Sequence, residues 1–579
     1  MGKRIFVLLL LIAFVMHPAA AGLRAQEIPA SNPRGWIPAD YAGFMSLSTQ
    51  SLSNTFNGLN MALLVASLLQ PTRADLVNTA SFDDLFPLAA QLDVPDFSIG
   101  QSIFPWLGDE LIVAYRDFAP GLTVDVDDML FILPTDDALQ SANSFSHVVQ
   151  AQDLLQREEY RSAILYIGDK TTFAITPEAV VIGQTDAVKA VLDLMAGTGE
   201  RLVDSPAYQA VAAASPADEL IFAYLDGSEA LPTLSFLLSG SDTAEPLLAA
   251  LGQALSEVRG EAAFEQVVLG DALEGVGISL RPDTLRLGTV RATLSLYDAD
   301  QPAPAEVADF NAELLELIPQ NAVVVQNGTD AAGAVWDVLY ALPLTNFVGQ
   351  ILSAFPVTPS PGALSGVVAA PGAGDLTRAV EGVLNVLDDV GNFDLEQDLL
   401  AHLGNSYSIA LLPRPNNPTP FFNTPYDVLL IAETTDSAAA LDGLTQLAQM
   451  ILGVGEVGTT TIEEFDFNVI QLRGGEPLLT LGVVDEALMI ATGDAMPPAL
   501  AARRGDNRLI SRPRWASISR DHTPQFYLDI PAFYSTFLPQ PGGAQLRAAE
   551  QLGAWSGYSG DGLYQVQMLV TLAGEIGAP

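Results

Sequence analysis

Two stretches of the chain, about three hundred residues apart, follow the same pattern. They are FAITPEAVVIGQTD (Phe173–Asp186) and LTLGVVDEALMIATGD (Leu479–Asp494). In each, an apolar segment meets an acidic turn, a second apolar segment follows, and an Asp precedes an Ala-containing helical pattern. Solenoid repeats are only about 20–50 residues long, so this spacing is too large for a solenoid. The pattern therefore predicts that one large unit occurs twice in the chain.

Other short matches recur in the same order in both parts of the chain. The apolar segments between these matches have the pattern of strands joined by tight turns, with helices interspersed. This arrangement predicts an α+β fold of two homologous units, each a mainly antiparallel sheet with packed helices, produced by internal duplication. The expected divisions are a signal peptide at 1–25, a first unit at 34–297, a linker at 298–308 and a second unit at 309–579. The matched pairs are Leu107 with Leu403, Asp128 with Asp427, Arg201 with Arg508, Tyr224 with Tyr527 and Ile37 with Ile318.

Apolar periodicity predicts the individual elements within these units. Strands are expected at 110–115, 129–133, 162–167, 428–432, 467–472 and 563–572, and a hairpin is expected at 276–297 that turns at Arg281-Pro282-Asp283. Helices are expected at 54–69, 82–92, 138–155, 187–195, 229–258, 438–452, 495–502 and 532–552. Two segments rich in Pro, Gly and Asn, 356–375 and 413–425, are expected to be loops.

The N-terminus has the three parts of a secretory signal. Lys3-Arg4 precede the apolar run Ile5–Met16, and small residues follow at Ala19–Ala21. The run is shorter than the roughly 20 residues that a membrane span needs, so cleavage after Ala21 or Ala25 is expected, with an uncleaved anchor as the alternative. The chain has no Cys, which excludes both a lipidated Cys and disulfides. We therefore expect an extracytoplasmic protein without a span in its mature part.

The charge of the chain limits its partners. Lys and Arg total 25 against 69 Asp and Glu, for a formal net charge of −44, while a hydrophobic content of 49% is ample for packed cores. Such a surface repels phosphate backbones and anionic membranes, which makes nucleic acid an unsuitable partner. It favours divalent cations or basic partners, although charge of this kind also serves solubility alone.

Several of these features together resemble a known family. They are the signal sequence, the early Ile37-Pro38-Ala39-Asp40, Trp106-Leu107-Gly108-Asp109 before a strand, and the hairpin FAITPEAVVIG followed by a helix. On these residues the chain resembles the secreted bacterial proteins catalogued as domain of unknown function 3352. The resemblance implies an exported protein made of two parts over nearly the whole mature chain. It implies no activity and no catalytic residues.

His and carboxylate residues are the candidate metal ligands of this chain. Zinc needs at least three protein ligands, but the chain after the signal holds only His147, His402 and His522, and His402 occupies the place of Trp106 in the other copy. We interpret His402 as a packing residue. Calcium suits the acidic composition better, and Asp125, Asp127 and Asp128 are the densest cluster, but they lack the twelve-residue loop of a specific calcium site. A solvated strand edge is the other interpretation of these three residues.

Catalytic motifs give no assignment. Gly453, Gly455 and Gly458 spell G-x-G-x-x-G, but a helix precedes them and a strand follows, which is the reverse of a dinucleotide site and indicates a helix cap and turn. There is no G-x-S-x-G motif, and a pairing of Ser559 with His522 rests on residue type alone. Paired carboxylates for glycoside hydrolysis are equally unspecific, because the sequence gives no separation between them. We assign no catalytic, cofactor-binding or metal residues and expect no cofactor.

The aromatic segment Phe421–Tyr426 lies inside a loop rich in Pro and Asn, where it could contact a partner or fold back onto the sheet. The sequence thus favours an exported, acidic, non-catalytic binding, scaffold or envelope-associated protein with an unknown protein or glycan partner. The alternative is an extracytoplasmic hydrolase that uses carboxylates, with calcium as a possible requirement.

Overall fold

A computed structural model gives the fold of the chain. It describes the following residues: 32–49, 103, 105–116, 129–151, 156–168, 171–215, 219–227, 273–283, 289–299, 310–335, 393–414, 426–452, 456–471, 477–520, 522–537, 549–560 and 562–572.

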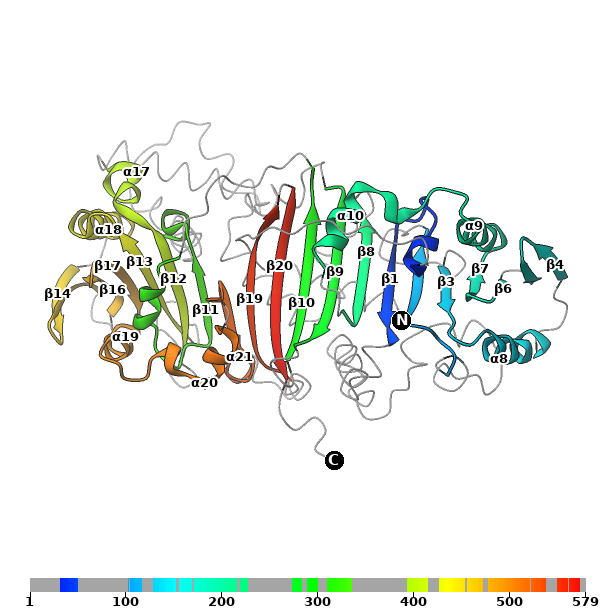
Figure 1. Cartoon of the computed structure of the whole chain (residues 1–579). Coiled ribbons are helices and arrows are strands. Elements are labelled where there is room, and N and C mark those ends of the chain that lie inside the picture. Colours follow the sequence, from blue (N-terminus) through cyan, green and yellow to red (C-terminus); the bar gives the residue numbers. More distant parts are fainter. Residues whose placement is uncertain are drawn as a thin grey trace, which may run out of the picture.

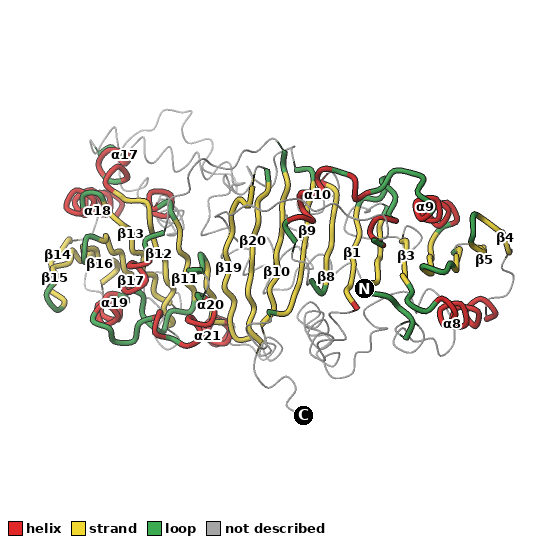
Figure 2. Tube along the Cα trace, viewed as in Figure 1, coloured by secondary structure: helices red, strands yellow, loops and turns green. Residues whose placement is uncertain are grey.

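The described strands form a single antiparallel sheet of 20 strands (Figure 1). Each strand pairs with its neighbours in antiparallel fashion, and the sheet begins and ends with the edge strands β4 and β14. Figure 2 shows the strands side by side across the whole width of the molecule. The pairings give the order β4-β5-β6-β7-β3-β2-β1-β8-β9-β10-β20-β19-β18-β11-β12-β13-β17-β16-β15-β14.

The elements have these bounds. The strands are β1 Gly43–Ser48, β2 Glu110–Tyr115, β3 Met129–Pro134, β4 Gln156–Tyr160, β5 Ala163–Ile167, β6 Thr172–Ile175, β7 Ala179–Gly183, β8 Ile221–Asp226, β9 Gly275–Pro282, β10 Thr289–Tyr297, β11 Val324–Gly328, β12 Leu403–Pro413, β13 Tyr426–Thr434, β14 Glu456–Ile462, β15 Phe465–Gln471, β16 Pro477–Val484, β17 Ala487–Thr492, β18 Phe526–Asp529, β19 Ala549–Gly560 and β20 Leu563–Leu572. The α-helices are α8 Ala138–Ala151, α9 Thr185–Met195, α10 Pro206–Ala213, α17 Leu395–Asp398, α18 Ser437–Leu452, α19 Met496–Arg503, α20 Pro513–Ile518 and α21 Ile530–Phe537. The 3-10 helices are η1 Pro33–Trp36, η4 Leu202–Asp204, η5 Ala312–Leu317, η6 Leu400–His402 and η7 Leu509–Ser511.

The expected fold class, an α+β protein of two homologous units that each have their own sheet, is wrong. Strands from both expected units belong to one continuous sheet, because β10 pairs with β20. The order of strand pairing does recur: the strands β1–β10 pair with one another in the same order as the strands β11–β20. We call these two sets of strands the first half and the second half of the sheet.

The joint between the halves is a long and regular pairing. All nine residues of β10, Thr289–Tyr297, pair with Leu563–Thr571 of β20 without a register shift. Three side-chain contacts cross this joint, from Arg291 Nη1 to Gln567 Oε1 at 3.2 Å, from Gln565 Nε2 to Ser295 Oγ at 3.1 Å, and between the hydroxyl oxygens of Thr289 and Thr571 at 3.4 Å. The backbone ladder therefore runs from one half into the other.

Helices cover both faces of the sheet, and buried apolar residues form separate clusters on the two faces. In the first half, α9 and α10 pack with Phe44, Leu130 and Tyr224 on one face, whereas Phe145 of α8 packs with Phe131 on the other. In the second half, α19 and α20 cover one face and α18 covers the other. Among the described residues, no helix combines the length and the apolarity that crossing a bilayer requires.

The helices α10 and α20 lie on the same face of the sheet. Gln565 of β20 donates to the carbonyl of Ala214, at the end of α10, at 3.2 Å. Leu569 lies four residues further along β20, and therefore on the same face, and its cross-strand partner Gly553 lies under Ile518 of α20. The central strands thus carry a helix on this face on either side of the β10–β20 joint.

The two stretches that match in sequence form hairpins of the same kind. Phe173–Asp186 covers the hairpin β6–β7 except for its first residue, and Leu479–Asp494 covers the hairpin β16–β17 except for its first two residues. In the second hairpin the turn residues Asp485 and Glu486 both have positive φ, 48° and 66°, as a type I′ turn requires. Both hairpins are followed directly by a helix, α9 or α19, as expected.

Several local expectations need correction. The helix expected at 138–155 is described only to Ala151, and β4 follows it where no strand was expected. The segment 532–552 was expected to be one helix, but α21 ends at Phe537 and Ala549 begins the strand β19. In the expected hairpin at 276–297, Arg281 and Pro282 belong to β9 instead of the turn. Segments 1–25, 54–69, 82–92, 229–258, 300–308 and 356–375 lie outside the described residues, as do 415–425.

Candidate functional site

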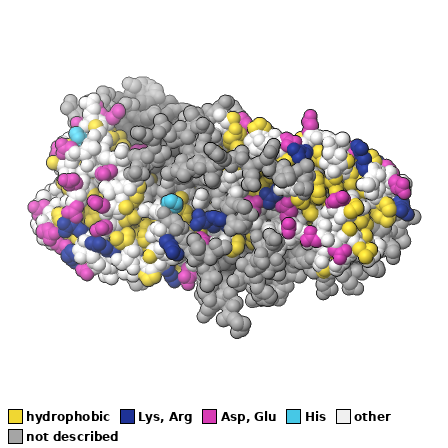
Figure 3. Space-filling view, in the orientation of Figure 1, with side chains coloured by type: hydrophobic (Ala, Val, Ile, Leu, Met, Phe, Trp, Pro, Cys, Tyr) yellow, Lys and Arg dark blue, Asp and Glu magenta, His cyan; other side chains and the backbone are white. Residues whose placement is uncertain are grey.

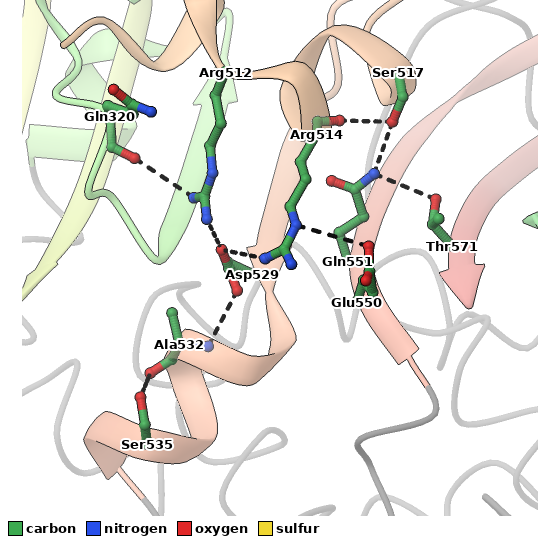
Figure 4. A network of polar contacts seen from close by, with 10 residues as sticks. All are labelled: Gln320, Arg512, Arg514, Ser517, Asp529, Ala532, Ser535, Glu550, Gln551 and Thr571. Atoms are coloured by element: carbon green, nitrogen blue, oxygen red, sulfur yellow. Dashed lines mark hydrogen bonds and ion pairs between the residues drawn. The ribbon is translucent and has the colours of Figure 1, made fainter. Parts of the chain in front are cut away.

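The most extended set of charged contacts in the second half centres on Asp529, whose side chain is 1% exposed (Figure 4). Its Oδ2 accepts from Arg512 Nη2 in a short contact and lies 3.5 Å from Arg514 Nη1. The other carboxylate oxygen accepts from the backbone N–H of Ala532 at 3.1 Å. Arg514 also lies 3.7 Å from Glu550, measured from Nε to Oε2. We call Arg512, Arg514, Asp529 and Glu550 the arginine network.

Local structure explains how these residues meet. Pro513 occupies the first turn of α20, where its missing N–H costs nothing, and Arg512 stands at the N-cap with an extended backbone. Asp529 ends β18 and caps the first turn of α21 through Ala532. Glu550 lies at the start of β19, next to β18 in the sheet. The network therefore joins two helices to two strands.

Polar contacts continue from the network toward the centre of the sheet. Gln551 Nε2 donates to Ser517 Oγ of α20 at 2.7 Å and to Thr571 Oγ1 of β20 at 3.3 Å. Thr571 in turn lies 3.4 Å from Thr289 of β10, between the two hydroxyl oxygens. A line of polar side chains thus crosses from α20 to the joint between the two halves of the sheet.

Tyr527 lies in β18, two residues before Asp529. It is fully buried, packs edge to face on Trp515 with ring centroids 5.1 Å apart, and its hydroxyl has no hydrogen-bond partner among the described residues. Burial raises the pKa of Tyr527 to about 12, because the phenolate would lose its hydration. The negative charge of Asp529 acts in the same direction, whereas Arg512 and Arg514 oppose it.

A second cluster lies in the first half and joins residues from three parts of the chain. Arg34 Nε donates to Glu110 Oε2 at 2.9 Å, and Arg34 Nη2 lies 2.8 Å from Glu219 Oε1. The guanidinium also stacks over the ring of Phe222 at 4.8 Å from the centroid. The three charged side chains are between 8% and 18% exposed. We call Arg34, Glu110 and Glu219 the glutamate pair cluster.

The charges in this cluster stabilise one another. Burial alone would lower the pKa of Arg34, but Glu110 and Glu219 more than offset this and raise it. Tyr208 lies beside them, and burial raises its pKa to about 12, with Arg34 acting in the opposite direction. A permanently charged arginine between two carboxylates forms strong charge-assisted hydrogen bonds. Such bonds hold together η1, β2 and Glu219, which lies two residues before β8.

Two further arginines connect a strand end to the Asp that precedes or opens a helix. Arg116 lies 2.9 Å from Asp186 at the start of α9, and Arg414 lies 3.0 Å from Asp494 just before α19. Side-chain hydrogen bonding to Arg116, with backbone bonds, lowers the pKa of Asp186 although partial burial would raise it. These ion pairs, like the two clusters above, link elements that are far apart in sequence.

The structure places the His residues apart from one another. His402 ends η6 and is half-buried, and its carbonyl accepts from the N–H of Thr435 at 2.9 Å. His522 is exposed, and its carbonyl accepts from Trp555 Nε1 at 3.1 Å. His147 lies in α8 and Ser559 in β19. Within the described parts of the chain, no three His, Asp or Glu residues group in a way that could hold a metal ion.

The remaining candidates fall mostly outside the described residues. This holds for Asp125, Asp127 and Asp128, for Gly453 and Gly455, and for Phe421–Pro425. Tyr426 begins β13, and Gly458 lies inside β14 instead of in a turn. The interpretation of the glycine motif is otherwise consistent with the structure, since α18 precedes these glycines and a strand follows them.

The arginine network and the glutamate pair cluster were not predicted from the sequence. Of the residues around the arginine network, the repeated pattern in the sequence singled out only Tyr527, as the match of Tyr224. A usable signal was the concentration of arginine at Arg508, Arg512 and Arg514, because the whole chain has only 25 Lys and Arg residues. No comparable signal marks Arg34 and Glu110, which stand 76 positions apart.

Comparisons with known proteins identify the family of the chain but no relative of known function. No curated protein matches the chain significantly. Two solved structures align with part of it. "Structure of crystal form I of TP0453" is 12% identical, covers 49% of this chain and 82% of its own, and has a TM-score of 0.25. "Structure of crystal form IV of TP0453" is 10% identical, covers 46% and 80%, and has a TM-score of 0.26. Similarities this low support no conclusion on fold or function.

The family assignment rests on sequence and covers most of the chain, including all strands from β2 to β20. The sequence model of the family described as "Protein of unknown function (DUF3352)" matches residues 95–572, and the chain therefore belongs to this family.

Proposed function

We propose that the chain is an exported, non-catalytic scaffold or binding protein of the cell envelope. The observation that carries this proposal is the continuous sheet of 20 antiparallel strands. Neighbouring strands lie about 4.8 Å apart, so the path across the sheet is on the order of 90 Å. Because the β10–β20 pairing is unbroken over nine residues, the sheet can act as one long platform.

The arrangement of charged side chains supports the same role. Asp529, with 1% exposure, accepts from two arginines and one backbone N–H, and Glu110 and Glu219 share Arg34. Charges arranged in this way stabilise the positions of helices and strands. The signal-like segment Lys3–Ala21 supports export, and the net charge of −44 favours a partner that carries positive charge.

The alternative is an extracytoplasmic hydrolase that acts through carboxylates. The observation that favours it is the pairing of Glu110 with Glu219 on Arg34, which brings together two carboxylates that lie 109 positions apart in the sequence. In glycoside hydrolysis two carboxylates act together on one bond. Both glutamates, however, already bind the same guanidinium, Glu110 at 2.9 Å and Glu219 at 2.8 Å, so each carboxylate has a charged partner.

One experiment separates the two roles. The purified full chain is incubated with isolated cell-envelope material, and both the co-sedimenting fraction of protein and the soluble sugar or peptide released are measured. The scaffold or binding role predicts co-sedimentation without release above the background. Release that Glu110→Gln and Glu219→Gln each abolish, while circular dichroism shows a retained fold, would establish the hydrolase instead. The absence of both co-sedimentation and release would contradict the proposed binding role.

A further inference from the structure

The two edges of the sheet differ in their chemistry. The edge strand β4 has the sequence QREEY, in which three consecutive residues, Arg157, Glu158 and Glu159, are charged. The opposite edge strand β14 has the sequence EVGTTTI, whose central residues are uncharged and mostly β-branched. Figure 1 shows these strands at the two ends of the molecule. Charged side chains on an edge strand disfavour pairing with another strand, whereas β-branched neutral residues favour it.

The outer side of β14 is accessible in the described structure. Gly458 and Thr459–Thr461 are exposed, and among the described strands β14 pairs only with β15. An edge strand of seven residues presents a row of backbone N–H and C=O groups on the side away from its partner. Such a row can bind an extended segment by adding it to the sheet as a further strand.

We propose that β14 is a docking strand for an extended segment of another protein that carries Lys or Arg. The segment adds to the sheet next to β14, with backbone hydrogen bonds along its length. This inference rests on the binding role proposed above and specifies its partner by chemistry. It assigns the partner to one edge of the sheet and excludes the charged edge at β4.

Side chains on both faces of β14 define what the incoming segment contacts. Val457, Thr459 and Thr461 lie opposite Ile470, Asn468 and Asp466 of β15, on the face that α18 covers through the contact of Asn468 Nδ2 with Thr445 Oγ1 at 3.0 Å. Residues at alternating positions point to the other face. There Ile462 packs with the cluster around Phe467 and Met496. The new strand would thus meet small and β-branched side chains in its middle.

The charge at this end of the molecule selects a basic segment. Residues 456–471, which form β14, β15 and their turn, include Glu456, Glu463, Glu464 and Asp466 but no Lys or Arg. Arg504 and Arg503 pair with Glu463 and Glu464, which leaves Asp466 without an arginine partner among the described residues. The corresponding segment at the other edge, 156–167, is balanced, with two carboxylates and two arginines. Figure 3 shows acidic side chains at the end of the molecule that carries β14, on the left, with basic side chains close beside them. Opposite charges speed association and orient the partner.

The same charge disfavours a second copy of the chain as the occupant. Pairing β14 with β14 of another copy would bring two identical acidic segments together, on two molecules with a formal net charge of −44 each. Arg503 and Arg504 lie nearby, but they already pair with Glu464 and Glu463. A partner with its own cations removes this repulsion.

The test uses the full chain and synthetic peptides. The probe is a fluorescein-labelled peptide, Lys-Thr-Val-Thr-Val-Thr-Lys, whose binding is followed by fluorescence anisotropy. One control peptide has Glu in place of both Lys, and another keeps the side chains but is N-methylated at alternate residues, which removes backbone donors. Two protein variants are compared with the wild type, the double variant Thr459→Lys/Thr461→Lys in β14 and the matched edge variant Gln156→Lys in β4.

The proposal predicts that the Lys peptide binds the wild type and the Gln156→Lys variant equally, and at least tenfold more weakly to the double variant. The Glu and N-methylated peptides should bind at least tenfold more weakly than the Lys peptide, and added salt should weaken binding. Equal binding of the Lys and Glu peptides, no effect of N-methylation, or no effect of the double substitution would each overturn the proposal. A dimer in analytical ultracentrifugation that the double variant abolishes would assign the edge to a second copy and overturn it too.

Failure of this inference is distinguishable from failure of the proposed function. If the peptides do not bind but the wild-type chain still co-sediments with envelope material, only the assignment to β14 is wrong. If the wild type fails to co-sediment as well, the binding role itself is contradicted.

Discussion

Asp529 carries the only negative charge that contacts both Arg512 and Arg514 within the described residues, and it is 1% exposed. Asp529→Asn keeps the shape and an acceptor for Ala532 but leaves two guanidinium groups facing a neutral amide. Removing one partner of a buried ion pair costs about 3–5 kcal/mol. Arg512 and Arg514 are partly exposed, so we expect a loss of about 2 kcal/mol, measured as a lower urea midpoint by circular dichroism.

The matched control is Asp204→Asn. Asp204 pairs with Arg201 three residues away, but its side chain is 51% exposed. Surface ion pairs contribute about 0–1 kcal/mol, so this variant should unfold close to the wild type. Equal midpoints for Asp529→Asn and the wild type would show that the arginine network does not stabilise the fold.

Tyr527 provides a prediction on pH. Its pKa is 10.0 in an unfolded chain and about 12 in the folded protein, so the folded state binds more protons between these values. The contribution of the Tyr527 hydroxyl to the free energy of unfolding is fully present below pH 10 and is lost as the pH rises toward 12. Tyr527→Phe has no proton to lose, so its thermal unfolding midpoint should decline less than that of the wild type over this interval.

At neutral pH the same variant should change stability little, because the Tyr527 hydroxyl has no hydrogen-bond partner among the described residues. Removal of an unpaired buried hydroxyl is nearly neutral or stabilising. Tyr208→Phe is the comparison, because the hydroxyl of Tyr208 lies beside Arg34 in the glutamate pair cluster. An alkaline decline in Tyr527→Phe as steep as in the wild type would contradict the assignment of this titration to Tyr527.

At the scale of elements, glycine sets how closely α20 approaches β19. A Cβ built on Gly553 would lie 2.1 Å from Cγ2 of Ile518, far inside a normal contact. Gly277 of β9 has the same relation to Val211 of α10, at 2.0 Å. Gly553→Ala should therefore displace α20 and destabilise the protein by about 1–3 kcal/mol, measured as a lower urea midpoint.

Two variants complete this test. Ile518→Ala in the Gly553→Ala background removes the colliding methyl group and should recover part of the loss. Gly458→Ala in the edge strand β14 is the control, because its nearest neighbour would be 3.9 Å away, an ordinary contact distance. If Gly553→Ala and Gly458→Ala behave alike, close packing of α20 on β19 is not what requires the glycine.

Elements with strong local signals were predicted well from the sequence. The strand at 110–115 has the predicted bounds, and α18 differs from the predicted helix by one residue. The edge strands β4 and β14 were missed for a physical reason. Both are largely exposed, so their side chains lack the apolar alternation that marks a half-buried strand. Their strand structure comes from backbone pairing with β5 and β15.

The contacts of the candidate sites could not be predicted for a related reason. Arg34, Glu110 and Glu219 meet because β1 lies between β2 and β8 in the sheet, and this order is a property of the whole topology. The sequence showed each residue but not their proximity. Asp529 differs, because it follows the matched Tyr527 and ends β18 just as Asp226 follows Tyr224 and ends β8, although its arginine partners were not recognisable.

At the scale of the whole molecule, the error in the fold class comes from what holds the two halves together. Repeated motifs indicate which strands occur, but the β10–β20 joint depends on backbone groups at two strand edges, which every sequence possesses. The short, acidic and Pro-containing segment at 298–308 suggested a linker between separate units. The chain continues past it, yet its last strand returns to pair with β10.

This joint makes the halves interdependent, which a fragment can test. A chain ending at residue 299 would leave all nine residues of β10 without the β20 partner. An exposed edge of this length is a template for pairing with another chain. We therefore expect the fragment to self-associate in analytical ultracentrifugation, and to form a one-to-one complex with the second half when that half is supplied in equal amounts.

Two sets of substitutions in that fragment show whether β10 is the contact. Thr293→Lys with Ser295→Lys places charges along the exposed strand and should prevent self-association, because lysine on an edge disfavours strand pairing. Gln156→Lys adds a positive charge at the edge strand β4 and should leave self-association unchanged. A folded fragment that stays monomeric without any substitution would mean that the first half is self-sufficient. The unbroken sheet would then be a contact between two units, and the proposed long, rigid platform would lose its basis.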